Sequence, residues 1–411
     1  MLLRALLKIM KISKRSLEVG LYTLLGGAVG LMRPTAIGEV YSFHIAVLCL
    51  SLIFVLLVLD RFEFAYFKCF PFMIQIFLMF TVGLYLFSHS VIMAYADIFN
   101  AFKGFLLTIL PVLILIVLVR KQGALKYFFD AFAFVILFSC FSIVVSFFLL
   151  AVGVGFESLH VLDFEYTYEG RGFVIFPMTF TFNPVDFGLG PMPRLSGLYR
   201  EPGVVPAFAC WGAAYSYIRR WPLWTTLVFV VGSLLSMSTL GVIALYTGML
   251  ILSNRMGLST GKSIAFFILV ALSVWPLVYG FDGVGLQAKI ESGSGSFDER
   301  YEQFFGFFGA ENMLFGDGPS WSGYDTTSIN LLAASRTFGS IFLLLILCFL
   351  SISVVVPLFF FMAMVPFVFV VFTAQPIVLD SSVIAIWFSW VCFVDGRFRC
   401  LGFEKHLKAT A

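Results

Sequence analysis

The run Phe43-His-Ile-Ala-Val-Leu-Cys-Leu-Ser-Leu-Ile-Phe-Val-Leu-Leu-Val-Leu-Asp60 carries no charged side chain before its last residue. A helix of this length and apolarity can cross the hydrocarbon core of a bilayer, which is about 30 Å thick. A spanning segment must satisfy its own backbone hydrogen bonds, and this run is too long for a β-barrel strand, so it predicts a helix. Comparable runs recur along the 411 residues, of which 61% are hydrophobic and 12% charged, with a mean hydropathy of +1.01. The chain is therefore predicted to be an all-α polytopic membrane protein.

The apolar runs predict about twelve transmembrane helices in a single integral membrane domain that covers residues 1–411. Two stretches, 221–253 and 337–373, are too long for one span each, because a helix of about 33 residues would run about 50 Å. We split each into a hairpin. The first break is marked by Ser233, Ser236, Ser238 and Thr239, and the second by Ser351, Ser353 and Pro357. The predicted spans are 16–32, 43–60, 70–89, 102–119, 131–152, 203–218, 221–237, 239–253, 264–281, 337–355, 357–373 and 381–394.

The distribution of lysine and arginine predicts which side of the membrane each loop faces, because short cytoplasmic loops are enriched in these residues. They occur in the N-terminal segment, in the loops after the second, fourth, sixth and eighth spans, and in the C-terminal tail. Both termini are therefore predicted to be cytoplasmic, and the two long loops 153–202 and 282–336 to lie on the outer face. The net charge of +3 is this cytoplasmic excess and indicates no nucleic-acid partner.

The motif Arg194-Leu-Ser-Gly-Leu-Tyr-Arg-Glu-Pro-Gly-Val-Val-Pro206 places two arginines and a carboxylate at the start of the sixth span. Proline in the first turn of a helix wastes no hydrogen-bond donor, and the free N–H groups of that turn attract anions. Arginine adds paired donors whose geometry suits phosphate. The motif thus predicts an anion site at the outer surface of the membrane. The alternative from the residues alone is that the arginines anchor a helix end in the interface.

The second outer loop contains Asp298-Glu-Arg300, the turn signal Phe315-Gly-Asp-Gly-Pro319, and then Asp325 and Arg336 before the next span. Neither outer loop contains a cysteine, the four histidines are scattered, and no CxxC spacing occurs. We therefore expect no metal ion and no other cofactor.

Together these segments resemble the O-antigen polymerase (Wzy-type) family of bacterial envelope polysaccharide synthesis. The resemblance is carried by residues 194–202, the serine- and threonine-rich run 233–241, Glu299-Arg300 with the Gly-Asp-Gly turn, and the stretch 325–339. It implies a GT-C-like architecture in the bacterial inner membrane and glycosyl transfer on the outer face. Donor and acceptor would both be undecaprenyl-pyrophosphate-linked glycans, and the product an O-antigen, capsule or exopolysaccharide. The resemblance leaves a chain-length regulator protein open as a partner, beside the lipid bilayer itself.

The resemblance also implies roles for individual residues. Outer-loop arginines would bind the donor pyrophosphate and stabilise the charge that builds on it as the sugar bond breaks. Glu201 is the first candidate for a general base toward the acceptor hydroxyl and Asp325 the second, while Glu201 could instead hold an arginine in place. Tyr199 and Glu299 are further expected substrate contacts. The arginines with the expected role are Arg194, Arg200, Arg300 and Arg336.

Two other functions compete with polymerisation. An O-antigen ligase shares the architecture and moves finished glycan to the lipid A core, but ligases usually present a histidine in the second large outer loop. This chain has no histidine between His160 and His406. A transporter or flippase commonly shows repeated halves and polar residues near the membrane midplane. We find no convincing repeat and no charge in the middle of a predicted span, so the polymerase is favoured.

Overall fold

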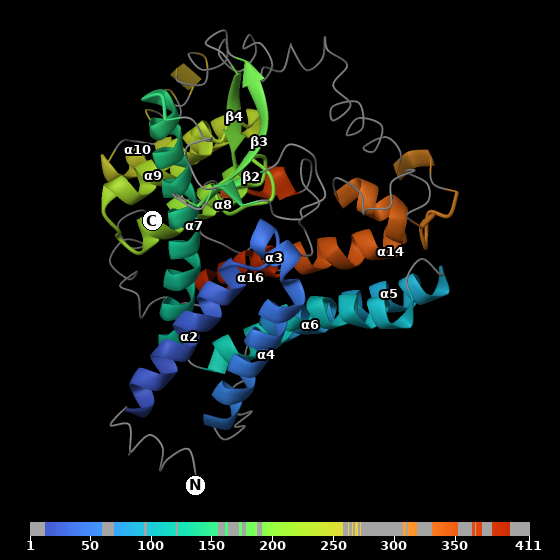
Figure 1. Cartoon of the computed structure of the whole chain (residues 1–411). Helices are drawn as coiled ribbons and strands as arrows, with labels where there is room; N and C mark the ends of the chain where they lie inside the picture. The colour runs from blue at the N-terminus through green and yellow to red at the C-terminus, as the bar shows by residue number, and fades with distance from the viewer. Residues whose placement is uncertain are drawn as a thin grey trace.

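The computed structural model describes residues 13–59, 70–93, 97–120, 122–154, 161–162, 172–174, 178–186, 191–257, 307–309, 311–318, 331–351, 364–365, 367–371 and 380–394, with the single positions 262, 265, 268, 269 and 272. Helices predominate in this part of the chain (Figure 1). They are α2 (Lys14–Gly30), α3 (Ala36–Val40), α4 (Ser42–Leu59), α5 (Phe70–Ile92), α6 (Ile98–Arg120), α7 (Gln122–Ala151), α8 (Val205–Ile218), α9 (Leu223–Leu235), α10 (Ile243–Arg255), α14 (Leu331–Ser351) and α16 (Ser381–Val394), with the short 3-10 helices η2 (Thr239–Val242) and η3 (Phe307–Gly309).

Among the described residues, four helices are long and apolar enough to cross a membrane: Ser42–Leu59, Ile74–Ile92, Leu125–Ala151 and Ala334–Ser351. They coincide with the predicted spans 43–60, 70–89, 131–152 and 337–355, so the prediction of a mostly helical membrane protein is confirmed at this level. Helices α2, α6, α8, α9, α10 and α16 fall on further predicted spans. The predicted spans 264–281 and 357–373 lie largely outside the described residues.

The long helix α7 is the centre of the packing, with α2 along one side and α8 and α9 against another (Figure 1). Buried aromatic rings join α7 to α8. Phe132 meets Trp211 edge to face with ring centroids 5.1 Å apart, and Trp211 stacks on Tyr215 at 5.0 Å. Such pairs add about 0.5–1.5 kcal/mol each beyond the burial of their surface. Helix α8, which follows the arginine motif, is thereby fixed against the core.

The stretch 221–253 folds as two helices, as predicted. Helix α9 ends at Leu235, and η2 and α10 follow after a turn that includes Met237 in the left-handed region (φ +52°). The Ser236 hydroxyl donates to the carbonyl of Ser233 at 2.7 Å and closes the end of α9. At the other end, the guanidinium of Arg255 donates to the carbonyl of Trp221 at 3.0 Å. The start of α9 and the end of α10 therefore lie together, which is the geometry of a hairpin.

The loop 153–202 contains a four-stranded antiparallel sheet, which was not predicted. Its order is β1-β2-β3-β4, and the strands are Val161–Leu162, Gly172–Val174, Thr179–Asp186 and Pro191–Leu195. The alternation Thr179-Phe-Thr-Phe182 is typical of a strand, but it is too short and too polar to resemble a membrane span. Strand β4 pairs Arg194 with Phe182 and leads directly into the arginine motif.

Candidate functional site

The arginine motif is held in place by a tight turn against α7. Gly197 has a positive φ of +58°, and an added Cβ would lie 2.2 Å from the hydroxyl oxygen of Ser139. Only glycine fits this close approach without strain. The N–H of Leu198 donates to the Ser139 hydroxyl at 2.9 Å, and the N–H of Gly197 donates to the Thr179 hydroxyl at 3.0 Å. The chain that carries Arg200 is therefore fixed by a helix on one side and by strand β3 on the other.

The segment that follows α2 pairs with this motif. Thr35 and Tyr199 form an antiparallel bridge. The N–H of Ala36 donates to the carbonyl of Leu198 at 2.9 Å, and the N–H of Arg200 donates to the carbonyl of Pro34 at 3.1 Å. These bonds join the first outer segment of the predicted topology to the arginine motif.

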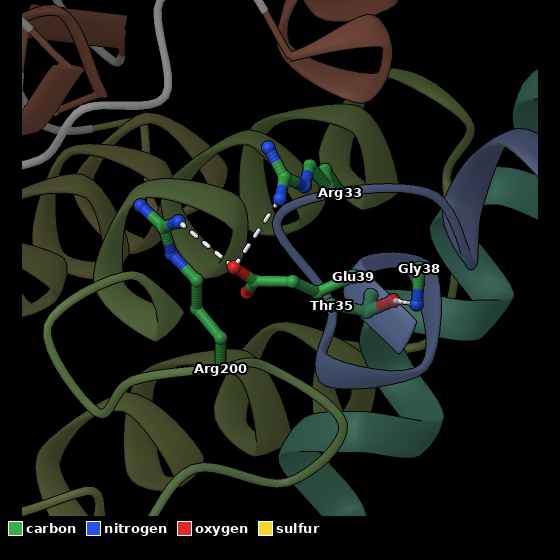
Figure 2. A network of polar contacts seen from close by, with 5 residues as sticks. All are labelled: Arg33, Thr35, Gly38, Glu39 and Arg200. Carbon is green, nitrogen blue, oxygen red and sulfur yellow. Dashed lines mark hydrogen bonds and ion pairs between the residues drawn. The ribbon is translucent and has the colours of Figure 1, made fainter. Parts of the chain in front are cut away.

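Helix α3 begins at this bridge and carries a carboxylate toward the motif. Thr35 caps the helix, because its hydroxyl accepts the N–H of Gly38 at 2.9 Å. The carboxylate of Glu39 then lies between two guanidinium groups, 3.4 Å from Arg33 and 3.9 Å from Arg200 (Figure 2). The Arg200 side chain is 14% exposed and that of Glu39 23%, whereas that of Arg33 is 49% exposed. One carboxylate thus orients two arginines, one half-exposed and one largely buried.

A second carboxylate completes the group. Asp380 directly precedes α16, and the Ser382 hydroxyl donates to the carbonyl of Arg33, which holds the start of α16 against the same segment. Asp380 is attracted by Arg200 and Arg33 and repelled by Glu39, and burial raises the pKa of its carboxyl to about 6. Its Oδ2 is enclosed and accepts no hydrogen bond from any residue that the structure describes. We call these four residues, Arg33, Glu39, Arg200 and Asp380, the Arg200 cluster.

The other candidates of the first loop lie around this cluster in different ways. Tyr199 is 1% exposed, and its ring packs on Phe208 with centroids 4.9 Å apart, so it faces the core. Arg194 is half-buried on β4. The carboxylate of Glu201 is also half-buried, and it makes no hydrogen bond or ion pair to another described residue. Among the described residues, the carboxylate that pairs with Arg200 is therefore Glu39.

Arg336 belongs to a second cluster, built on α14. Its guanidinium donates to Asp317 of the Gly-Asp-Gly turn at 3.1 Å, and the N–H of Asp317 donates back to the carbonyl of Arg336 at 2.9 Å. Burial would raise the pKa of the Asp317 carboxyl, but hydrogen bonds from the backbone of Asn312, from Arg336 and from the backbone of Glu311 outweigh it, so this pKa is lowered. The turn segment 311–318 sits on a kink of α14 at Gly339 (φ +86°), where an added Cβ would lie 2.1 Å from the carbonyl oxygen of Leu314. We call Asp317, Arg336 and this segment the Arg336 cluster.

The remaining predicted site residues, Glu299, Arg300 and Asp325, lie outside the described residues. Within the described part of the chain, no group of three or more His, Cys, Asp or Glu side chains is arranged to hold a metal ion.

Sequence reasoning did not single out Arg33, Glu39 and Asp380. A signal was present: charge is scarce in this chain, and all three are charged residues next to a predicted span on the predicted outer side. Comparison of the chain with protein-family models, with curated proteins and with solved structures finds no match.

Proposed function

We propose that the chain is a membrane glycosyltransferase that polymerises undecaprenyl-pyrophosphate-linked repeat units on the outer face of the bacterial inner membrane. The observation that carries the proposal is the Arg200 cluster, in which Arg33 and Arg200 share the carboxylate of Glu39. Two guanidinium groups held around one carboxylate offer several donors for a diphosphate. They would stabilise the negative charge that collects on the pyrophosphate as it leaves the sugar.

The proposed topology of twelve spans is supported by the contacts of the cluster. In that topology Arg33 follows the first span, Arg200 precedes the sixth and Asp380 precedes the twelfth, so all three lie on the outer side. Their proximity agrees with this arrangement, because residues on opposite faces of a hydrocarbon core of about 30 Å could not meet. The hairpin of α9 and α10 also supports this topology, because it returns the chain to the side of the membrane on which α9 began.

Substitution of Arg200 tests the proposal. In a strain whose own copy is deleted, Arg200→Ala should leave single repeat units on the acceptor in place of long ladders, with the protein at its normal level in the membrane. Arg200→Lys should also lose most activity, because lysine cannot make paired contacts to a phosphate. The matched control is Arg220→Ala, an exposed arginine at the other end of α8. Normal ladders from Arg200→Ala would exclude a pyrophosphate role for this side chain.

One observation supports the ligase as the second candidate. The ring of His89 on α5 lies 2.7 Å from the carbonyl oxygen of Phe315, in the segment that bears Asp317. A histidine therefore stands beside the second outer loop, although none occurs within it. The deletion strain distinguishes the two functions: loss of all glycan from the core indicates a ligase, and a single-unit band indicates a polymerase. Intact ladders in that strain would contradict both.

A further inference from the structure

The Arg200 cluster contains one carboxylate, that of Asp380, which forms no hydrogen bond or ion pair with either arginine. Glu39 is shared by Arg33 and Arg200, whereas the Oδ2 of Asp380 is enclosed and accepts no hydrogen bond from the described residues. We propose that Asp380 is the catalytic base that takes the proton of the acceptor hydroxyl, an inference that rests on the proposed function. Glu39 is then a positioning residue, which orients the two arginines.

The surroundings of Asp380 suit this role. Arg200, from the segment before α8, and Arg33, from the segment between α2 and α4, attract its carboxylate, and Glu39 repels it. The start of α16 is held from two sides, by the Ser382 hydroxyl on the carbonyl of Arg33 and by the Ser381 hydroxyl on the carbonyl of Leu107 in α6. A carboxylate on a fixed helix end, beside the groups that would bind the leaving diphosphate, is where a base for the attacking hydroxyl is required.

The reaction balances with this assignment. The acceptor hydroxyl oxygen attacks the anomeric carbon of the donor sugar and forms the new glycosidic bond. The bond between that carbon and the pyrophosphate oxygen breaks, and its electron pair leaves with undecaprenyl pyrophosphate. The hydroxyl proton passes to Asp380 and later to water. No oxidant, reductant or further reactant is needed.

The charges of the cluster also balance through this step. With both carboxylates ionised, two positive charges stand against two negative ones. The leaving diphosphate gains one negative charge when the sugar bond breaks, and Asp380 loses one negative charge when it takes the proton. The net charge that the two arginines face is therefore unchanged, which avoids the repulsion that a permanently ionised second carboxylate would add.

The pKa of the Asp380 carboxyl suits a general base that works near neutral pH. Burial raises the pKa of its carboxyl to about 6, although Arg200 and Arg33 oppose the rise. A base of this pKa is ionised at neutral pH and takes a proton more readily than an ordinary carboxylate. Transfer should therefore be slow at low pH, where Asp380 is already protonated, and should rise with a midpoint near pH 6 before it levels off.

The test uses the full chain purified in detergent and lipid-linked repeat units extracted from a strain that lacks it. For Asp380→Asn we expect the rate of transfer to fall by about 10²–10⁴-fold, with the donor KM within about threefold of the wild type. Asp380→Glu keeps an ionisable group and should retain measurable transfer with a rising pH profile. In contrast, Arg200→Ala should raise the donor KM as well as lower the rate.

Three outcomes decide between the possibilities. Transfer by Asp380→Asn at the wild-type rate, or with the wild-type pH profile, overturns the assignment of the base and leaves the proposed function intact. A donor KM that rises as much as the rate falls, in a protein of unchanged thermal stability, also overturns it, because the residue would then act in binding. Failure of the wild-type chain to transfer any glycan overturns the proposed function and this inference together.

Discussion

The guanidinium of Arg200 lies 3.9 Å from the carboxylate of Glu39, a residue that the chain supplies from the short helix between its first two long helices. The contact depends on the bridge between Thr35 and Tyr199, which aligns the two segments. Arg200 thus belongs to a charged group whose other members come from outside its own sequence motif.

Loss of the charge on Glu39 should impair turnover more than donor binding. Glu39→Gln leaves Arg33 and Arg200 in place but removes the anion that orients both. We expect the rate of transfer to fall about tenfold, equivalent to about 1.4 kcal/mol of transition-state stabilisation. The control is Glu18→Gln, which breaks the pair of Glu18 with the exposed Lys14 at the far end of α2. This pair lies at the end of α2 away from the cluster, so the control should transfer glycan at the wild-type rate. Full activity of Glu39→Gln would count against a positioning role.

Replacement of Gly197 should displace the arginine motif. Alanine at φ +58° is strained by about 1–3 kcal/mol, and its Cβ would also overlap the Ser139 hydroxyl. We expect Gly197→Ala to lower the melting temperature in detergent and to shorten the polymer ladder. Gly20→Ala is the matched control, since Gly20 lies inside α2 with nothing within 4 Å of an added Cβ. Alanine there should stabilise the helix by about 0.5–1 kcal/mol. Equal melting temperatures for the two variants would contradict the argument.

Local sequence patterns were sufficient for the long helices that the structure describes and for the arginine motif, because each depends on consecutive residues. A long apolar run specifies a helix in lipid wherever it occurs, and the polar residues Ser236 and Ser238 mark the break of the α9–α10 hairpin. The partners of Arg200 are different. Glu39 and Asp380 reach it only through contacts between segments that lie far apart in the chain, and no periodicity encodes these contacts.

The small sheet illustrates the same limit. Its strands alternate polar and apolar residues over short stretches, and their pairing depends on register with one another. The Gly-Asp-Gly turn was visible in the sequence, but its packing against α14 depends on the kink at Gly339. Sequence reasoning expected Arg336 to meet the substrate, whereas the structure adds that Asp317 binds its guanidinium. The expected contact with substrate stays a prediction.

If α9 and α10 form a hairpin in the membrane, the start of α9 and the end of α10 should both face the cytoplasm. The hydrogen bond from Arg255 to the carbonyl of Trp221 places these ends together. Cysteines introduced as Arg220→Cys and Met256→Cys, both at exposed positions, should react with an impermeant maleimide only after the membrane is opened. Met178→Cys, on the predicted outer side, should react in intact cells. Labelling of Arg220→Cys and Met256→Cys from opposite sides would show that 221–253 crosses the membrane once.

The pair of Asp317 and Arg336 should make the turn segment sensitive to acid. The folded pKa of Asp317 is below its ordinary value, so its contribution to stability is present above pH 4 or so and is lost as the pH falls through the folded pKa. Asp317→Asn should lower the opening free energy of the segment by about 1.5–3 kcal/mol at pH 7. Hydrogen exchange at Asp317 and Gly318, whose N–H groups bond to α14, measures this. Glu311→Gln, an exposed change in the same segment, is the control and should leave exchange unaltered.

Asp380 should act on stability in the opposite direction. Because burial raises its folded pKa to about 6, above its ordinary value, the folded state binds the proton more tightly than the unfolded state. The free energy of unfolding therefore falls as the pH rises from about 4 to about 6, and it stays lower above this range. Asp380→Asn removes this loss, so at pH 7.5 its melting temperature should equal or exceed that of the wild type, with the difference gone at pH 4. Asp317→Asn should instead destabilise at pH 7.5. An ionised carboxylate that weakens the fold is consistent with a role in activity and not in stability. A lower melting temperature of Asp380→Asn at pH 7.5 would remove this support for a catalytic role.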